Sequence, residues 1–297
     1  MTQVTPSDRD TLQRFIFENA PIRGELVHLD ASWQAIQARH DYPAPVRKLL
    51  GEMMAASALL VSTLKFEGTL TIQFQGSGPI NLMVMEATHE RTIRGIAKWE
   101  GDVADGAIST LFGNGTLAIT IDPAKTGERY QGIVEICGDT LSECLEHYLT
   151  HSEQLDTHIW LAADEQQASG MLLQRLPGDI SDENHEDWER AVALATTITG
   201  KELLELPTKE VLHRLFHEED LRLFDREPLS FRCSCSRERV GGMLKSLGID
   251  QVHDILNEEE VIEVGCEFCN QKYSFDKIDA EQLFAADINI QPPKQPQ

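Results

Sequence analysis

The sequence predicts an α+β protein: an N-terminal, mostly antiparallel sheet domain with a central buried helix, then a helical linker and a small C-terminal domain. Three observations indicate this order. Short apolar runs separated by turn residues predict strands up to residue 177. A long, nearly uncharged run among them predicts a buried helix, and two amphipathic segments precede a cysteine-rich tail. The predicted boundaries are 1–178, 179–231 and 232–297.

Most of the first domain is predicted to be β structure. Apolar and polar residues alternate from Leu70 to Phe74, and the turn Gly76-Ser77-Gly78-Pro79 leads the chain into a return strand. Asn114-Gly115 is typical of a two-residue hairpin turn, because both positions of that turn need positive φ. The predicted strands are 14–17, 24–29, 70–74, 80–85, 92–97, 107–112, 116–121 and 129–136, with a last hairpin over 158–175.

Helices are predicted in two settings. After Pro43 and Pro45, the run VRKLLGEMMAASALLVSTLKF has few charges beyond Glu52, which favours a buried helix, and a second helix is predicted at 140–150. In the linker, helices are predicted at 182–197 and from Pro207 through 216. Each has an apolar stripe and an acidic face. Such helices cannot form a core alone, so we expect their stripes to pack on the first domain.

Charge and hydropathy exclude several functions. Lys and Arg total 26 against 49 Asp and Glu, and the net charge of −23 disfavours nucleic acid and anionic lipid as partners. The uncharged part of the predicted buried helix, Met53 to Leu64, has twelve residues, whereas a membrane span needs roughly 20. The N-terminus has neither the basic start nor the apolar stretch of a secretory signal. We therefore expect a cytoplasmic protein whose thiols stay reduced unless they bind metal or react.

Four of the six cysteines form two close pairs. Cys233 and Cys235 are separated by thirty residues from Cys266 and Cys269, and two such pairs can converge on one tetrahedral zinc ion. Strands are predicted into and out of the second pair, with helices between the two pairs. The single residue within the first pair is shorter than usual for structural zinc.

Arg232, Arg237 and Arg239 flank that first pair. Nearby cations are expected to lower thiol pKa values and to favour thiolate, the form that oxidants attack. The spacing leaves two interpretations open, a permanently structural zinc site and a zinc site that can be oxidised.

The other candidate sites are weaker. Cys137 and Cys144 are expected to be buried and not to bind metal. Two histidine pairs have helical i, i+4 spacing but no obvious third ligand, so they are expected on solvated faces: His147 with His151, and His213 with His217. The sequence contains neither a P-loop nor a nucleophile elbow.

The segments FRCSCSRERV and EVGCEFCNQKYSF closely resemble the zinc centre of the 33-kilodalton heat-shock protein family, redox-regulated holdase chaperones of the bacterial cytoplasm. The segment IRGELVHLD, the run from Tyr42 to Ala87 and the hairpin before Pro177 agree with that family. The resemblance covers essentially the whole chain, and no ligand position departs from the motif.

The resemblance implies a function that spacing alone does not give. The reduced protein, with one zinc ion on the four cysteines, would be inactive. Oxidation would form the disulfides Cys233–Cys235 and Cys266–Cys269, expel zinc and unfold the tail and linker. The exposed surface would then bind unfolding or oxidatively damaged client proteins without ATP, usually as a homodimer. The resemblance implies no catalytic residues, and it assigns no role to Cys137 or Cys144.

Two other classes of protein remain as alternatives. A zinc-ribbon regulator of transcription or translation would need to bind nucleic acid, which the net charge disfavours. An enzyme would be a zinc hydrolase or a thiol oxidoreductase. Four thiolate ligands leave no open zinc position for water, and a CxxC oxidoreductase motif usually begins a helix rather than joining two strands.

Overall fold

The computed structural model describes residues 9–63, 67–125, 127–177 and 182–288, without the side chains at 182–184 and 286–288. Gly178 and the C-terminal QPPKQPQ, which the sequence suggests to be disordered, lie outside these residues. Contacts divide the chain into two compact units, Met1–Arg232 and Cys233–Gln297. No helix within the described ranges is both long enough and apolar enough to cross a membrane.

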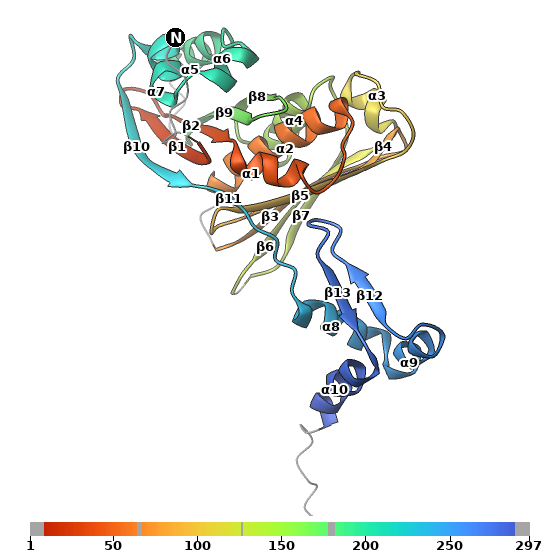
Figure 1. The fold of residues 1–297 in the computed structure, drawn as a ribbon. Helices are drawn as coiled ribbons and strands as arrows, with labels where there is room; N and C mark the ends of the chain where they lie inside the picture. The colour runs from red at the N-terminus through yellow and green to blue at the C-terminus, as the bar shows by residue number, and fades with distance from the viewer. Residues whose placement is uncertain (1–8, 64–66, 126, 178–181, 289–297) are drawn as a thin grey trace, which may run out of the picture. The chain divides into compact units, whose positions relative to one another are not determined.

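The first unit contains two sheets (Figure 1). One has six strands in the order β11-β5-β4-β3-β6-β7, antiparallel except where β11 meets β5. Its strands are β3 Gly68–Gln75, β4 Ile80–Thr88, β5 Thr92–Trp99, β6 Thr116–Pro123, β7 Tyr130–Glu135 and β11 Ser230–Phe231. Leu70, Ile72 and Phe74 of β3 are buried, as the alternation in the sequence predicts.

The second sheet has five antiparallel strands in the order β10-β1-β2-β9-β8. Its strands are β1 Thr11–Phe17, β2 Ile22–Leu29, β8 Thr157–Ala163, β9 Ala168–Arg175 and β10 Leu221–Pro228. Seven consecutive residues of β9 are buried, because both faces of this sheet are covered.

The central helix is α2, Ala44–Thr63, and it packs against strands of both sheets. Its residues from Met53 to Val61 are all buried, which confirms the predicted buried helix. The main core unites this helix with Leu12 and Leu172 of the five-stranded sheet and with Ile72 of the six-stranded sheet. The other helices around these sheets are α1 Ala31–Gln37, α3 Ile108–Phe112 and α4 Leu141–Ser152.

Three further helices cover the opposite face of the five-stranded sheet, and we call them the cover: α5 Asp182–Ala195, α6 Gly200–Glu205 and α7 Thr208–Phe216. Trp188 and Phe216 from the cover share a second core with Phe15, Leu26 and Met171 from the sheet. The phenyl rings of Phe216 and Phe17 meet edge to face at 5.2 Å. This packing confirms that the amphipathic stripes lie on the first domain.

Two predictions for the first unit need correction. Residues 107–112, predicted as a strand, form the short helix α3, because Leu111 and Phe112 reach the main core from a helical turn. Asn114-Gly115 therefore joins a helix to β6, and the positive φ of this turn lies at Gly113, at 62°. The segment 179–231 also contains β10 and β11, which the sequence analysis did not predict. β10 is a strand because it pairs with β1.

The second unit is small. It contains α8 Arg237–Leu247, α9 Ile249–Glu258, β12 Ile262–Gly265, β13 Lys272–Phe275 and α10 Lys277–Ile288. The two strands form an antiparallel hairpin, as predicted around the second cysteine pair. Within its described part, the fully buried core consists of Leu244, Val252, Leu256, Ile262, Phe275 and Ala280. A core of this size gives a short chain little stability of its own.

Candidate metal centre

Each cysteine pair is positioned by a tight local structure. Cys233 and Cys235 immediately precede α8, whose first turn is capped by Ser236: its Oγ accepts from the backbone N–H of Arg239 at 3.2 Å. Cys266 and Cys269 lie in the turn between β12 and β13. There Asn270, with φ of 59°, reverses the chain, and its N–H donates to the carbonyl of Cys266 at 2.8 Å.

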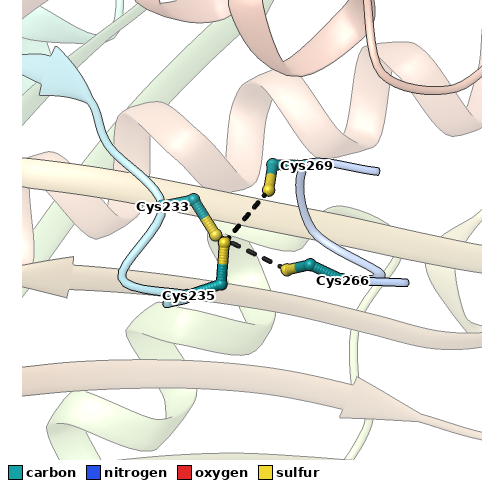
Figure 2. Close-up of side chains that lie close together, drawn as sticks. All are labelled: Cys233, Cys235, Cys266 and Cys269. Carbon is teal, nitrogen blue, oxygen red and sulfur yellow. Dashed lines mark hydrogen bonds between the residues drawn. The ribbon is translucent and has the colours of Figure 1, made fainter. Parts of the chain in front are cut away.

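The four sulfur atoms converge. All lie within 4.8 Å of one another, and the Sγ–Sγ distances are 3.6 Å for Cys233 with Cys266 and 3.4 Å for Cys235 with Cys269 (Figure 2). Zinc bound tetrahedrally at about 2.3 Å holds its sulfur ligands about 3.8 Å apart. The four side chains therefore form a cluster able to hold a metal ion, and all four thiols are free of disulfides.

Burial affects the thiols of the second cysteine pair. Burial raises the pKa of the Cys269 thiol to about 12 and also raises the pKa of Cys266. These two groups would keep their protons without a bound cation, whereas a metal ion favours the thiolate form.

The arginines hold the backbone around the cluster. Arg239 Nη1 donates to the carbonyl of Ser234 at 3.0 Å, between the two cysteines of the first pair. Arg237 Nη1 donates to the carbonyl of Ser274 at 2.7 Å, and Nη2 forms an ion pair of 2.8 Å with Asp279. Both side chains therefore stabilise the two backbone segments that carry the sulfurs, Cys233–Cys235 and Cys266–Cys269, which we call the arms.

Sequence reasoning missed the contact of Tyr273 with the cluster. This residue was predicted only as the start of the outgoing strand. Its hydroxyl donates a hydrogen bond of 3.1 Å to Sγ of Cys235, which raises the pKa of Tyr273 to about 12 and keeps the hydroxyl protonated. The sequence signal was an aromatic residue four positions after the last cysteine, at the start of a strand that returns toward the first pair.

Cys137 and Cys144 belong to the first unit and are absent from the cluster. Cys144 is buried and donates to the carbonyl of Cys137, and burial raises the pKa of its thiol to about 12. Cys137 is only half-buried, because it lies in the segment between β7 and α4, so the expectation of burial is correct for Cys144 alone.

The histidine pairs stay within their helices. The rings of His147 and His151 stack at 4.0 Å, and those of His213 and His217 lie 6.0 Å apart. In the described ranges neither pair is joined by a third residue that could complete a metal site. The pairs therefore offer no second candidate centre.

Comparison with known proteins agrees with this architecture. The crystal structure of a 33 kDa chaperonin, a heat shock protein 33 homolog from Thermotoga maritima, superposes with a TM-score of 0.81 over 94% of this chain and 99% of that chain. At 21% sequence identity this likeness shows the fold. The family model described as Hsp33 protein matches residues 10–276.

Curated relatives extend the match to nearly the full length. The 33 kDa chaperonin of Nitrosococcus oceani is 52% identical over 283 residues, 95% of this chain and 96% of that protein. The 33 kDa chaperonin of Methylobacillus flagellatus is 48% identical over 280 residues, 94% and 96% of the two chains. Together with the four-cysteine cluster, these findings define a molecular chaperone rather than an enzyme. The chain belongs to the Hsp33 family.

Proposed function

We propose that this protein is a redox-regulated, ATP-independent holdase whose four-cysteine cluster is the switch. In the reduced state, Cys233, Cys235, Cys266 and Cys269 hold one zinc ion and the protein is inactive. On oxidation the cluster loses its metal, the second unit and the cover unfold, and an apolar surface binds unfolding or oxidatively damaged proteins. The observation that carries this proposal is the convergence of four sulfurs within 4.8 Å in a unit with a very small core.

The size of that core supports the first step. Bound zinc gives a small domain about 10–16 kcal/mol of apparent binding free energy, whereas the core of a domain this short supplies only about 3–5 kcal/mol. The second unit would therefore unfold when the cluster loses its metal. Four thiolate ligands also leave no coordination position for a reacting water molecule, which supports a structural and regulatory role over hydrolysis.

The oxidation step balances with hydrogen peroxide as the oxidant. One thiolate of a pair takes oxygen from peroxide to become a sulfenic acid, and the O–O bond breaks with release of hydroxide. The second thiolate attacks that sulfur, so the S–S bond forms, the S–O bond breaks and a second hydroxide leaves. Formation of each disulfide transfers two electrons to one peroxide molecule. Two peroxide molecules therefore oxidise the four thiolates.

A physical argument selects the pairing Cys233–Cys235 and Cys266–Cys269. Two of the sulfur distances join the first cysteine pair to the second, at 3.4 Å and 3.6 Å. Disulfides across these distances would tie the arms together and replace the metal as a staple. Disulfides within each pair leave the arms independent, so only this connectivity couples oxidation to unfolding. Reduction by the glutathione pool would restore the thiols if the couple is more oxidising than that pool.

Chain connectivity supports transmission to the first unit. β11 ends at Phe231, two residues before Cys233, and β10 and the cover precede it directly. If unfolding spreads back along this segment, Trp188 and Phe216 leave their sites on the sheet and expose Phe15, Leu26 and Met171. Contiguous apolar surface of this kind binds unfolded chains. The net charge of −23 would keep the opened protein soluble.

The test compares the two redox states of one preparation in a client aggregation assay. Light scattering of a thermally unfolding client is recorded without ATP, with either the reduced zinc-loaded protein or protein treated with peroxide at mildly raised temperature. We expect protection only from the oxidised form, and loss of protection after dithiothreitol. Equal protection by the reduced form would refute the redox gate, and peptide mapping that finds disulfides between the arms would refute the pairing.

A further inference from the structure

We propose that the cavity between the cover and strand β8 binds a small primary amine with an apolar body, and that this ligand holds the cover in place. Binding concerns the reduced, closed protein alone. The effect of the ligand on activation rests on the proposed function, in which displacement of the cover exposes the client-binding surface.

The cavity lies within the first unit and has a volume of about 500 Å³. This size is typical of the pockets that hold small organic ligands. Its walls come mainly from α2, from the first turns of α4, from β8 and from the end of α5 together with α6. Walls on several sides favour a compact ligand over an extended peptide. Because α5 and α6 belong to the cover, the cavity is complete only while the cover lies on the sheet.

Each of these walls contributes apolar side chains. They include Leu49 of α2, Leu141 of α4 and Trp160 of β8, and the cover adds Ile198 and Leu203. A ligand that fills this space gains free energy by burying an apolar body. Trp160 also brings an aromatic ring to the wall, and the face of such a ring attracts organic cations.

The charged side chains around the cavity are mostly acidic. They are Lys48 and Glu52 of α2, Asp105, Asp139, Glu143 and Glu146, and His158 of β8. Two of the carboxylates already have partners. Glu146 accepts the N–H of Ile159 at 2.6 Å and pairs with His158 at 3.2 Å, and Glu143 accepts the N–H of Thr140 at 3.3 Å in the capping box of α4. The excess of negative charge favours a cation over an anion as ligand.

Glu52 is the carboxylate that a ligand would satisfy. Among the described residues it forms neither a hydrogen bond nor an ion pair, and the exposed Lys48, one turn earlier on α2, acts on it only through its charge. Burial raises the pKa of the Glu52 carboxyl from 4.5 to about 7. A ligand ammonium in the cavity would supply this group with both a counter-charge and hydrogen-bond donors. A neutral or anionic ligand brings no counter-charge, so the site favours an amine.

The ligand would touch parts of the protein that separate when it opens. Glu52 and Trp160 belong to α2 and to the five-stranded sheet, whereas Val192, Ile198 and Leu203 would move with the cover. A ligand that binds only one of two states shifts the population toward that state. At a concentration one hundred times its dissociation constant, the amine would lower the open fraction about hundredfold. An amine in the cell would therefore raise the level of stress that activates the chaperone.

The test uses the reduced, zinc-loaded full chain and three probes of similar size: 2-phenylethylamine, neutral 2-phenylethanol and anionic 3-phenylpropanoate. Binding is followed by NMR through the indole N–H of Trp160. The amine should bind more tightly than the alcohol, and the carboxylate most weakly. Glu52→Gln should weaken amine binding about tenfold or more and leave alcohol binding unchanged, which also shows that the variant is folded. The matched control is Glu135→Gln, at an exposed position outside the cavity.

Binding of the amine should also depend on pH. Between pH 6 and pH 8 Glu52 becomes ionised while the amine stays protonated, so the affinity of wild type should rise about tenfold. Loss of the proton from His158, whose pKa is raised by its hydrogen bond with Glu146, acts in the same direction. Glu52→Gln should reduce this rise, whereas Glu135→Gln should keep it.

Hydrogen exchange over 185–216 measures the effect on the cover, and saturating amine should slow it in wild type but not in Glu52→Gln. The proposal is overturned if amine and alcohol bind wild type equally, if Glu52→Gln binds the amine like wild type, or if bound amine leaves exchange of the cover unchanged. Binding of a lysine-containing peptide without binding of the free amine would mean that the cavity takes a peptide side chain instead. Since no oxidant or client is used, failure of the redox gate leaves these results intact.

Discussion

The hydroxyl of Tyr273 donates a hydrogen bond of 3.1 Å to Sγ of Cys235, a residue 38 positions earlier in the chain. A hydrogen bond to a charged sulfur stabilises its electron pairs and makes the sulfur less nucleophilic. In the proposed switch, the bond therefore slows attack of this thiolate on peroxide and links the β12–β13 hairpin to the first cysteine pair.

Replacement of Tyr273 by Phe tests this role. The ring stays and the hydroxyl is lost, so zinc release by peroxide should accelerate, by up to about tenfold if the hydrogen bond to the charged sulfur is worth ~1.4 kcal/mol. Zinc release is followed with a chromogenic chelator while thiols are counted. Tyr130→Phe, in the first unit, is the control. A release rate equal to that of wild type would show that the hydroxyl does not restrain the sulfur.

The ligand assignment is tested by four serine variants. Changing Cys233, Cys235, Cys266 or Cys269 to Ser should each weaken zinc retention by orders of magnitude, because a hydroxyl replaces a soft thiolate ligand. Retention is measured by competition with a chelator, and circular dichroism should report loss of helix in the second unit. Cys137→Ser should retain zinc as wild type does. Equal loss in that control would contradict the assignment.

The cover allows a test, without oxidant, of whether its displacement exposes the surface that binds clients. Phe216 is 2% exposed and lies edge to face with Phe17, so Phe216→Ala should destabilise the packing of the cover by about 3–5 kcal/mol. Hydrogen exchange over 185–216 should become faster, and the reduced variant should already protect a client. His213→Ala, at an exposed position of the same helix, should change neither property. Fast exchange without any protection of the client would contradict the proposal that displacement of the cover exposes the client-binding surface.

A pH dependence follows from Glu25. This residue is 1% exposed, accepts a hydrogen bond from Ser62 Oγ, and has its pKa raised by burial from 4.5 to about 7. The folded state holds this proton more tightly than the unfolded state does. The free energy of unfolding should therefore fall as pH rises from about 4.5 to about 7, by on the order of 3 kcal/mol, and stay low above that range.

The variant Glu25→Gln isolates this contribution. At pH 8 the variant should have a higher free energy of unfolding than wild type. This difference should disappear near pH 4.5, where the folded wild type carries a protonated, uncharged Glu25 and the variant carries an uncharged amide. All four tryptophans lie in the first unit, so their fluorescence during denaturation reports on this unit. Glu135→Gln, at an exposed position, is the control. A constant difference between Glu25→Gln and wild type at every pH would contradict the titration.

Local patterns were sufficient for the parts of the fold that depend on local chemistry. The uncharged run after Glu52 predicted α2, and the spacing of Cys233, Cys235, Cys266 and Cys269 predicted the cluster, because two thiol pairs have few other structural uses. The sequence could not indicate β10. Its residues LRLFDREP carry several charges, and they form a strand only because β1, far away in the chain, offers a partner.

The short helix α3 and the role of Tyr273 were missed for a similar reason. Residues 107–112 include β-branched and aromatic types, and their helical turn is set by contacts with the main core. The hydrogen bond of Tyr273 depends on how the hairpin returns to the first cysteine pair. In each case a tertiary contact decides the structure, and no local period in the sequence encodes that contact.

The pairing of β1 with β10 also constrains how each copy of the protein is made. Thr11 lies opposite Pro228, and a ribosome adds about 5–20 residues per second, so roughly 10–40 s separate the synthesis of the two strands. In that interval β1 has no β10 to pair with, and for most of it the cover, residues 182–216, has not yet been made. If the proposed function holds, each newborn chain would expose the surface under the cover during synthesis, and it would become latent only after translation has nearly reached the cysteine-rich end.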